Sequence, residues 1–106
     1  MICSKLLTLS LIYATNDNVA EQLKTKINNI MQSDEFDNEM CIVTKELLIN
    51  IEQCNNNKVE LFITMFTTLT DKTIKLGKLI RSYISNNLTE IFVDNVKCKL
   101  IKKIIY

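Results

Sequence analysis

The sequence predicts an all-α protein, a compact bundle of about five to seven helices in a single domain over residues 1–106. Two observations lead to this prediction. Apolar residues recur at intervals of three and four through most of the chain, which is the spacing of one face of a helix. Proline is absent and Gly77 is the only glycine, whereas folds rich in hairpins usually need these residues in their turns.

Three helices are expected in the first half of the chain, over residues 2–14, 18–32 and 40–54. The first segment is predicted to be a buried helix, although the alternation of Leu7, Leu9 and Leu11 also fits a strand. The second is amphipathic and follows Asn16 and Asp17, either of which can cap a helix. SDEFDN is expected to be a polar connection to the third. That helix ends at the run NNN, since asparagine competes for helical hydrogen bonds.

Three more helices are expected over residues 58–70, 71–85 and 88–104. The segment 58–70 is predicted to be the buried central helix, although its threonines and β-branched residues also permit a strand. Its core positions are Phe62, Met65, Phe66 and Leu69. Asn87 and Glu90 have the spacing of a capping box, which predicts that the last helix starts after Asn87.

The segment Asn87-Leu88-Thr89 is also an N-glycosylation sequon, which gives an alternative interpretation. In this alternative the protein is a secreted, cytokine-like helical protein, with residues 1–14 as signal peptide, a glycan on Asn87 and two disulfides. The capping interpretation is preferred because it explains the N-x-x-E pattern without a sugar. The four cysteines form no C-x-x-C pair and three fall on apolar helix faces, so we expect buried free thiols.

The composition argues against several classes of function. There is no histidine and no glycine-rich loop, so we expect no enzyme, no cofactor and no metal site. The net charge is +1 and Arg81 is the only arginine, so no nucleic-acid partner is expected. No apolar run approaches the roughly 18 residues that span a bilayer, so no membrane span is expected.

Two stretches of the second half, NNNKVELFITMFTTL and SYISNNLTEIFVDN, resemble the order of segments in the Bcl-2 fold. There, a buried helical hairpin is followed by a tyrosine-containing helix that leads into the second homology motif. The chain is similar above all to the small, diverged Bcl-2-like proteins of poxviruses, which have similar LF-x-T and N-[IL]-T-[DE] stretches. It departs from the family where the first motif has Asn-Trp-Gly-Arg, because Asn55 to Asn57 and Lys58 stand there.

The resemblance implies a viral virulence factor in the host cell cytoplasm that inhibits innate immune signalling or apoptosis by binding host proteins. Its expected partners are host signalling or pro-apoptotic proteins. A partner-binding groove is expected between the helices over 40–54 and 58–70. Its residues are Val43, Leu47, Lys58, Phe62, Met65 and Phe66. A second candidate surface, formed by the N-terminal and 71–85 helices, often serves dimerisation in the poxvirus relatives and implies a homodimer.

Overall fold

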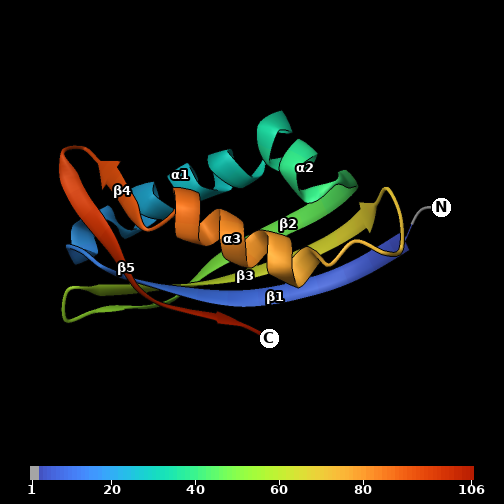
Figure 1. The fold of residues 1–106 in the computed structure, drawn as a ribbon. Helices are drawn as coiled ribbons and strands as arrows, with labels where there is room; N and C mark the ends of the chain where they lie inside the picture. The colour runs from blue at the N-terminus through green and yellow to red at the C-terminus, as the bar shows by residue number, and fades with distance from the viewer. Residues whose placement is uncertain (1–2) are drawn as a thin grey trace.

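A five-stranded antiparallel sheet, with helices packed on one face, is the main feature of the fold (Figure 1). The computed structural model describes residues 3–106. Its strands are β1 (Cys3–Ala14), β2 (Ile42–Asn55), β3 (Lys58–Leu69), β4 (Glu90–Val93) and β5 (Val96–Ile105). Its helices are η1 (Asp17–Val19), α1 (Ala20–Met31), α2 (Asp34–Met40) and α3 (Leu76–Asn87). The all-α prediction and the helical bundle are therefore wrong.

The strand order is β2-β3-β1-β5-β4, and each neighbouring pair is antiparallel. β1 and β2 are joined through α1 and α2, yet β3 lies between them, so the two strands run parallel without touching. This is the split β-α-β arrangement, here extended on the other side of β1 by the β4–β5 hairpin. The topology leaves one face of the sheet for the helices and the other face uncovered.

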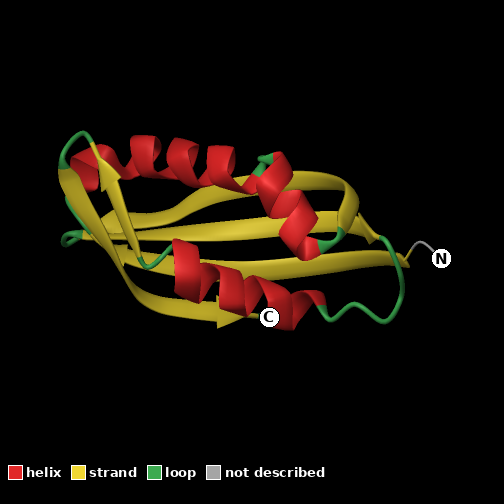
Figure 2. Cartoon of the chain, turned by 45° about the horizontal axis from the view of Figure 1, so that its top comes forward, coloured by secondary structure: helices red, strands yellow, loops and turns green. Residues whose placement is uncertain are grey.

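The helices all lie on the same side of the sheet (Figure 2). α1 packs against β2 and β4, and α2 packs against β2 and α3. Alternate strand residues point toward these helices, because successive side chains of a strand point to opposite faces. The buried apolar residues on β1 and β3 are Leu7, Leu9, Leu11, Tyr13, Val59, Leu61, Ile63, Met65 and Leu69. The helices contribute Leu23, Ile27, Met31, Ile80 and Ile84, which complete one core between the sheet and the helices.

Two tight turns without glycine connect the paired strands. Asn56 and Asn57 link β2 to β3 with φ angles of 53° and 59°, and Asp94 and Asn95 link β4 to β5 with 48° and 67°. Two successive positive φ angles define the type I′ turn that suits a two-residue hairpin. Asparagine and aspartate tolerate this left-handed region better than other side chains do. A chain with one glycine and no proline can therefore still form hairpins.

Several local predictions change with the fold. Of the expected helices, 3–14 is β1, 40–54 is mostly β2, 58–70 is mostly β3, and 88–104 contains β4 and β5, with α3 ending at Asn87 and β4 starting at Glu90. The capping box is therefore wrong, and the Asn87 amide instead donates to the carbonyl oxygen of Tyr83. Residue 2 of the first expected helix lies outside the described residues. The SDEFDN connection is mostly helix α2, capped by the side chain of Ser33. The expected helices over 18–32 and 71–85 correspond to α1 and α3.

The cysteines also differ from the prediction of three buried thiols on helix faces. All four are free, but only Cys98 is buried, while Cys54 is exposed and Cys3 and Cys41 are half-buried. Cys3, Cys54 and Cys98 lie on strands, and Cys41 is the C-cap residue of α2.

Candidate functional site

The residues predicted to line a groove lie on two paired strands, β2 and β3. Met65 is fully buried beneath the helices, and its partner Leu47 packs against the same core. Lys58, Phe62 and Phe66 alternate with these core residues and point to the uncovered face. Val43 is half exposed, at the register shift near the start of β2. The predicted set is therefore divided between two faces of one sheet, and the groove between helices is wrong.

The uncovered face carries a cluster of apolar and aromatic side chains, which we call the open-face patch. It consists of Leu6, Ile12, Leu48, Phe62, Phe66, Ile104 and Tyr106. Phe66 is 49% exposed and Leu6 is 65% exposed, although both are large apolar residues. Isolated exposed apolar residues are normal on soluble proteins, but a contiguous group of this kind marks an interaction surface.

The strand register makes the patch continuous. Phe66 on β3 pairs with Leu6 on β1, and Phe62 pairs with Ser10, whose partner on β5 is Ile104. Leu48 on β2 pairs with Thr64, which lies between Phe62 and Phe66 on the same face. Directly opposed side chains on neighbouring strands lie about 5 Å apart, so these residues form one surface across four strands.

The centre of the patch is held in place by hydrogen bonds and ring contacts. The ring of Tyr106 lies over the sheet beside Phe62, with centroids 6.0 Å apart and planes inclined at 50°. The backbone N–H of Tyr106 donates to the carbonyl oxygen of Thr8 at 2.9 Å, which anchors this residue to β1. Beneath the rings, Ser10 is buried and its hydroxyl donates to Glu60 at 3.3 Å.

Two exposed charged side chains, Glu46 and Lys102, stand at opposite corners of the patch. Glu46 on β2 is exposed and pairs with Phe66, whereas Lys102 on β5 is exposed and pairs with Ile12. Beside Glu46 the surface is hollowed by a shallow depression of about 280 Å³, whose lining includes Leu48, Thr64 and Phe66. The patch thus has an apolar centre, an anionic corner at Glu46 and a cationic corner at Lys102. Glu60, in the row of Ile12 on the same face, is half-buried and accepts the hydrogen bond from Ser10.

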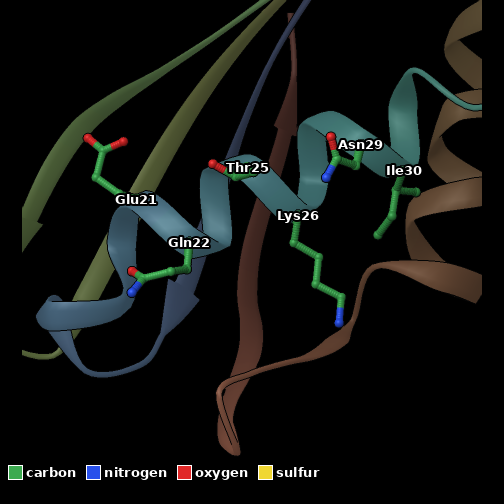
Figure 3. A pocket seen from close by; sticks show the side chains of 6 residues that line it. All are labelled: Glu21, Gln22, Thr25, Lys26, Asn29 and Ile30. Atoms are coloured by element: carbon green, nitrogen blue, oxygen red, sulfur yellow. The ribbon is translucent and has the colours of Figure 1, made fainter.

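A larger depression of about 550 Å³ lies along the outer side of α1. Its lining residues are Glu21, Gln22, Thr25, Lys26, Asn29 and Ile30. Figure 3 shows that these side chains spread along one helix, and Lys26 points toward the β4 segment. The Lys26 ammonium donates to the carbonyl oxygen of Phe92 at 2.9 Å. The side chains do not converge on a common point, so this surface has a weaker claim to be a binding site than the open-face patch.

The titratable groups with shifted pKa values belong to the structural core or to a turn. Burial, assisted by the nearby Cys98, raises the pKa of Tyr13. Burial also raises the pKa of Tyr83, and Glu39 and Glu35 add to this effect. Hydrogen bonds from Thr73 lower the pKa of Asp71 in the loop before α3. None of these groups lies in the open-face patch.

Residues 3–106 lack two further features. There, no three His, Cys, Asp or Glu side chains come together in a way that would hold a metal ion. Within the same range, no helix has the length and apolar character needed to cross a membrane.

No family model matches the sequence, and it matches no curated protein or solved structure either. The resemblance to Bcl-2-like proteins of poxviruses therefore stays a prediction. The helical architecture that this resemblance implied is wrong, because the first supporting stretch forms β3 and the second forms the end of α3 and β4. Sequence reasoning also missed Leu6, Leu48 and Ile104. A period of two separates the two faces of each strand, but only the pairing between strands places these residues on the face of Phe62 and Phe66.

Proposed function

We propose that this chain is a protein-binding module that acts through the open-face patch and performs no reaction of its own. The observation behind this proposal is the contiguous set of apolar side chains that the helices leave uncovered. Monomeric soluble proteins rarely expose a contiguous apolar surface of more than a few hundred Å², and such surfaces usually mark interaction sites.

The construction of the patch suits protein binding. Phe62, Phe66 and Tyr106 supply large rings, the kind of side chain that contributes most to protein interfaces. Phe62 and Phe66 project from a paired strand, and Phe62 is in ring contact with Tyr106, which limits the freedom that these two rings lose on binding. Glu46 and Lys102 at the corners provide the polar rim that such interfaces have.

The wider biological role rests on the resemblance alone. Inhibition of host innate signalling or apoptosis, in the host cell cytoplasm, is still a prediction from that resemblance. The geometry supports the binding step and the surface on which it takes place.

A photo-crosslinking experiment tests this proposal. A photoreactive phenylalanine analogue is placed at Phe66, and in a control protein at Asn29, which is exposed on α1. Both proteins are expressed in animal cells and irradiated. We expect one discrete protein adduct from position 66, lost when Phe62→Lys is added, and none from position 29. Absence of an adduct at position 66, or equal adducts at both positions, would contradict the proposal.

A further inference from the structure

The two charged corners of the open-face patch identify its occupant. We propose that the partner is a second copy of this chain, packed face to face so that Glu46 of each copy meets Lys102 of the other. This inference rests on the proposed function, because it names the protein that the open-face patch binds.

The separation of the corners follows from the strand register. Glu46 lies in the row of Phe66 and Leu6, and Lys102 lies in the row of Ile12. From Leu6 to Ile12 is six residues of strand, or about 20 Å, and from β2 to β5 is three inter-strand spacings, or about 14 Å. The two charges therefore stand at the ends of one diagonal, with the apolar side chains between them.

Both charges lack a partner within the described part of the chain. The ion pairs of residues 3–106 are Lys45 with Asp37 and Lys97 with Glu90, so neither Glu46 nor Lys102 is neutralised by a neighbour. A charged side chain beside a large apolar patch remains hydrated and gains most from an opposite charge supplied by whatever covers the patch.

A two-fold axis in the plane of the face, perpendicular to this diagonal, exchanges the corners. Such an interface is isologous: when one residue meets another, the reverse contact also forms. Glu46 then meets the partner's Lys102, and Lys102 meets the partner's Glu46, so both charges are paired at once. In a dimer where each corner met the same corner of the other copy, glutamate would oppose glutamate and lysine would oppose lysine, at a cost of several kcal/mol.

The apolar residues are compatible with the same axis. The midpoint of the diagonal lies between the rows of Thr64 and Phe62, so Phe62 is close to the axis and meets its own copy. Leu6 and Phe66, near the anionic corner, face the region of Ile104, which lies two residues from Lys102 on β5, while Tyr106 lies beside Thr8 nearer the middle of the patch. Apolar side chains therefore oppose apolar side chains across the interface.

The size of the patch sets the strength of the association. The rectangle of about 20 by 14 Å, widened by its side chains, offers roughly 400 Å² from each copy. The total area buried by the two copies together is below the standard size of stable interfaces and lies in the range of weak, reversible complexes. The dimer should therefore form at micromolar or higher concentrations and exchange readily.

Charge reversal combined with sedimentation velocity tests the arrangement. The wild-type chain is measured from about 1 μM to 1 mM. The variants are E46K, K102E and the double variant E46K/K102E, with E21K on α1 as the control for an equal change of charge on the helical side. We expect the dissociation constant to rise at least about tenfold in each single variant. It should return to within about threefold of wild type in the double variant, and E21K should match wild type.

Each other outcome counts against the inference. A wild-type chain that stays monomeric to 1 mM would overturn it, and so would a dimer that is insensitive to the single reversals or not restored by the double variant. A second titration uses a 15-nucleotide oligothymidylate. Binding that is lost in K102E would also overturn the inference, because the face would then serve a single-stranded nucleic acid. A monomer that still gives an adduct with a different protein at Phe66 would overturn only the second-copy inference and leave the proposed function standing.

Discussion

The hydroxyl of Tyr13 donates a 2.7 Å hydrogen bond to the carbonyl oxygen of Leu88, which lies 75 residues further along the chain. Tyr13 is fully buried on the central strand β1, and Leu88 is the C-cap residue of α3. A carbonyl at a helix end has no partner inside its own helix, so the tyrosine satisfies a group that would otherwise be buried unpaired. This single contact joins the middle of the sheet to the end of α3.

We expect Tyr13→Phe to lower the free energy of unfolding by about 1–2 kcal/mol. The ring still fills its space, but the carbonyl oxygen of Leu88 loses its donor inside the protein. Urea denaturation of the two proteins measures the difference. Tyr106→Phe is the matched control, because Tyr106 is 67% exposed, and it should leave the unfolding free energy unchanged. Equal stabilities for wild type and Tyr13→Phe would show that the hydrogen bond contributes nothing.

The same tyrosine should make stability depend on pH in the alkaline range. Burial, assisted by Cys98, raises the folded-state pKa of Tyr13 above its ordinary value of 10.0. A group whose folded pKa is raised contributes stability that is complete below its unfolded pKa and is lost as pH rises toward the folded value. Stability should therefore fall from about pH 10 upward. Urea midpoints between pH 8 and pH 11 measure this fall, and a Tyr13→Phe protein with the same slope would contradict the assignment.

Lys45 and Asp37 form an ion pair that joins β2 to α2, with side-chain exposures of only 5% and 27%. The ammonium also lies 5.7 Å from the ring centre of Phe36. Asp37→Asn leaves a buried cation without its counter-charge and should lower the free energy of unfolding by about 3 kcal/mol. Lys45→Met removes the cation and keeps the packing, so its effect should stay within about 1 kcal/mol.

Thermal or urea unfolding of both variants checks this difference. Glu39→Gln, exposed on the same helix, controls for the loss of one negative charge and should be neutral. If Lys45→Met were as damaging as Asp37→Asn, the pair itself would be stabilising, and the cost would not come from an unpaired buried charge.

Substitutions in the turn between β2 and β3 should change stability according to how well the new residue tolerates a positive φ angle. Asn57 has a φ of 59°, where a β-branched side chain is strained by roughly 1–2 kcal/mol. Asn57→Val should therefore destabilise the protein by about that amount, and Asn57→Gly should be neutral or slightly stabilising. Asn50→Val is the control, because Asn50 is exposed in the middle of β2 with an ordinary strand φ. Equal effects at positions 50 and 57 would argue against the type I′ turn.

These turns also explain why the sequence pattern predicts helices instead of hairpins. Scarce glycine and absent proline argue against tight turns, yet Asn56-Asn57 and Asp94-Asn95 supply the positive φ angles with side chains. α1 could be predicted because Leu23, Ile27 and Met31 recur at helical spacing with Asn16 just ahead. In β2 and β3, by contrast, apolar residues occupy both faces. The alternation that would identify a strand is hidden, and spacings of three and four appear by coincidence.

Only part of the candidate site could be predicted from the sequence. The sequence predicts Lys58, Phe62 and Phe66 as binding residues, and the structure places them together on the uncovered face. Leu47 and Met65 are predicted with them because positions three or four residues apart lie on one side of a helix. In a strand, positions an odd number of residues apart lie on opposite faces. The contributions of β1 and β5 depend on pairing across 44 or more residues, which no local pattern in a single sequence reveals.

Met65 and Phe66 provide the sharpest test of that difference. They are neighbours in β3, but Met65 is fully buried and Phe66 is 49% exposed. Met65→Lys places an ammonium in the core without a partner and should unfold the protein or cost at least about 3 kcal/mol. In Phe66→Lys the new side chain projects into solvent, so the substitution should change the unfolding free energy by less than about 1 kcal/mol. Urea denaturation followed by far-ultraviolet circular dichroism measures both. A buried helix over residues 58–70 would make both substitutions severe, so two equally large losses would argue for the helix and against the strand.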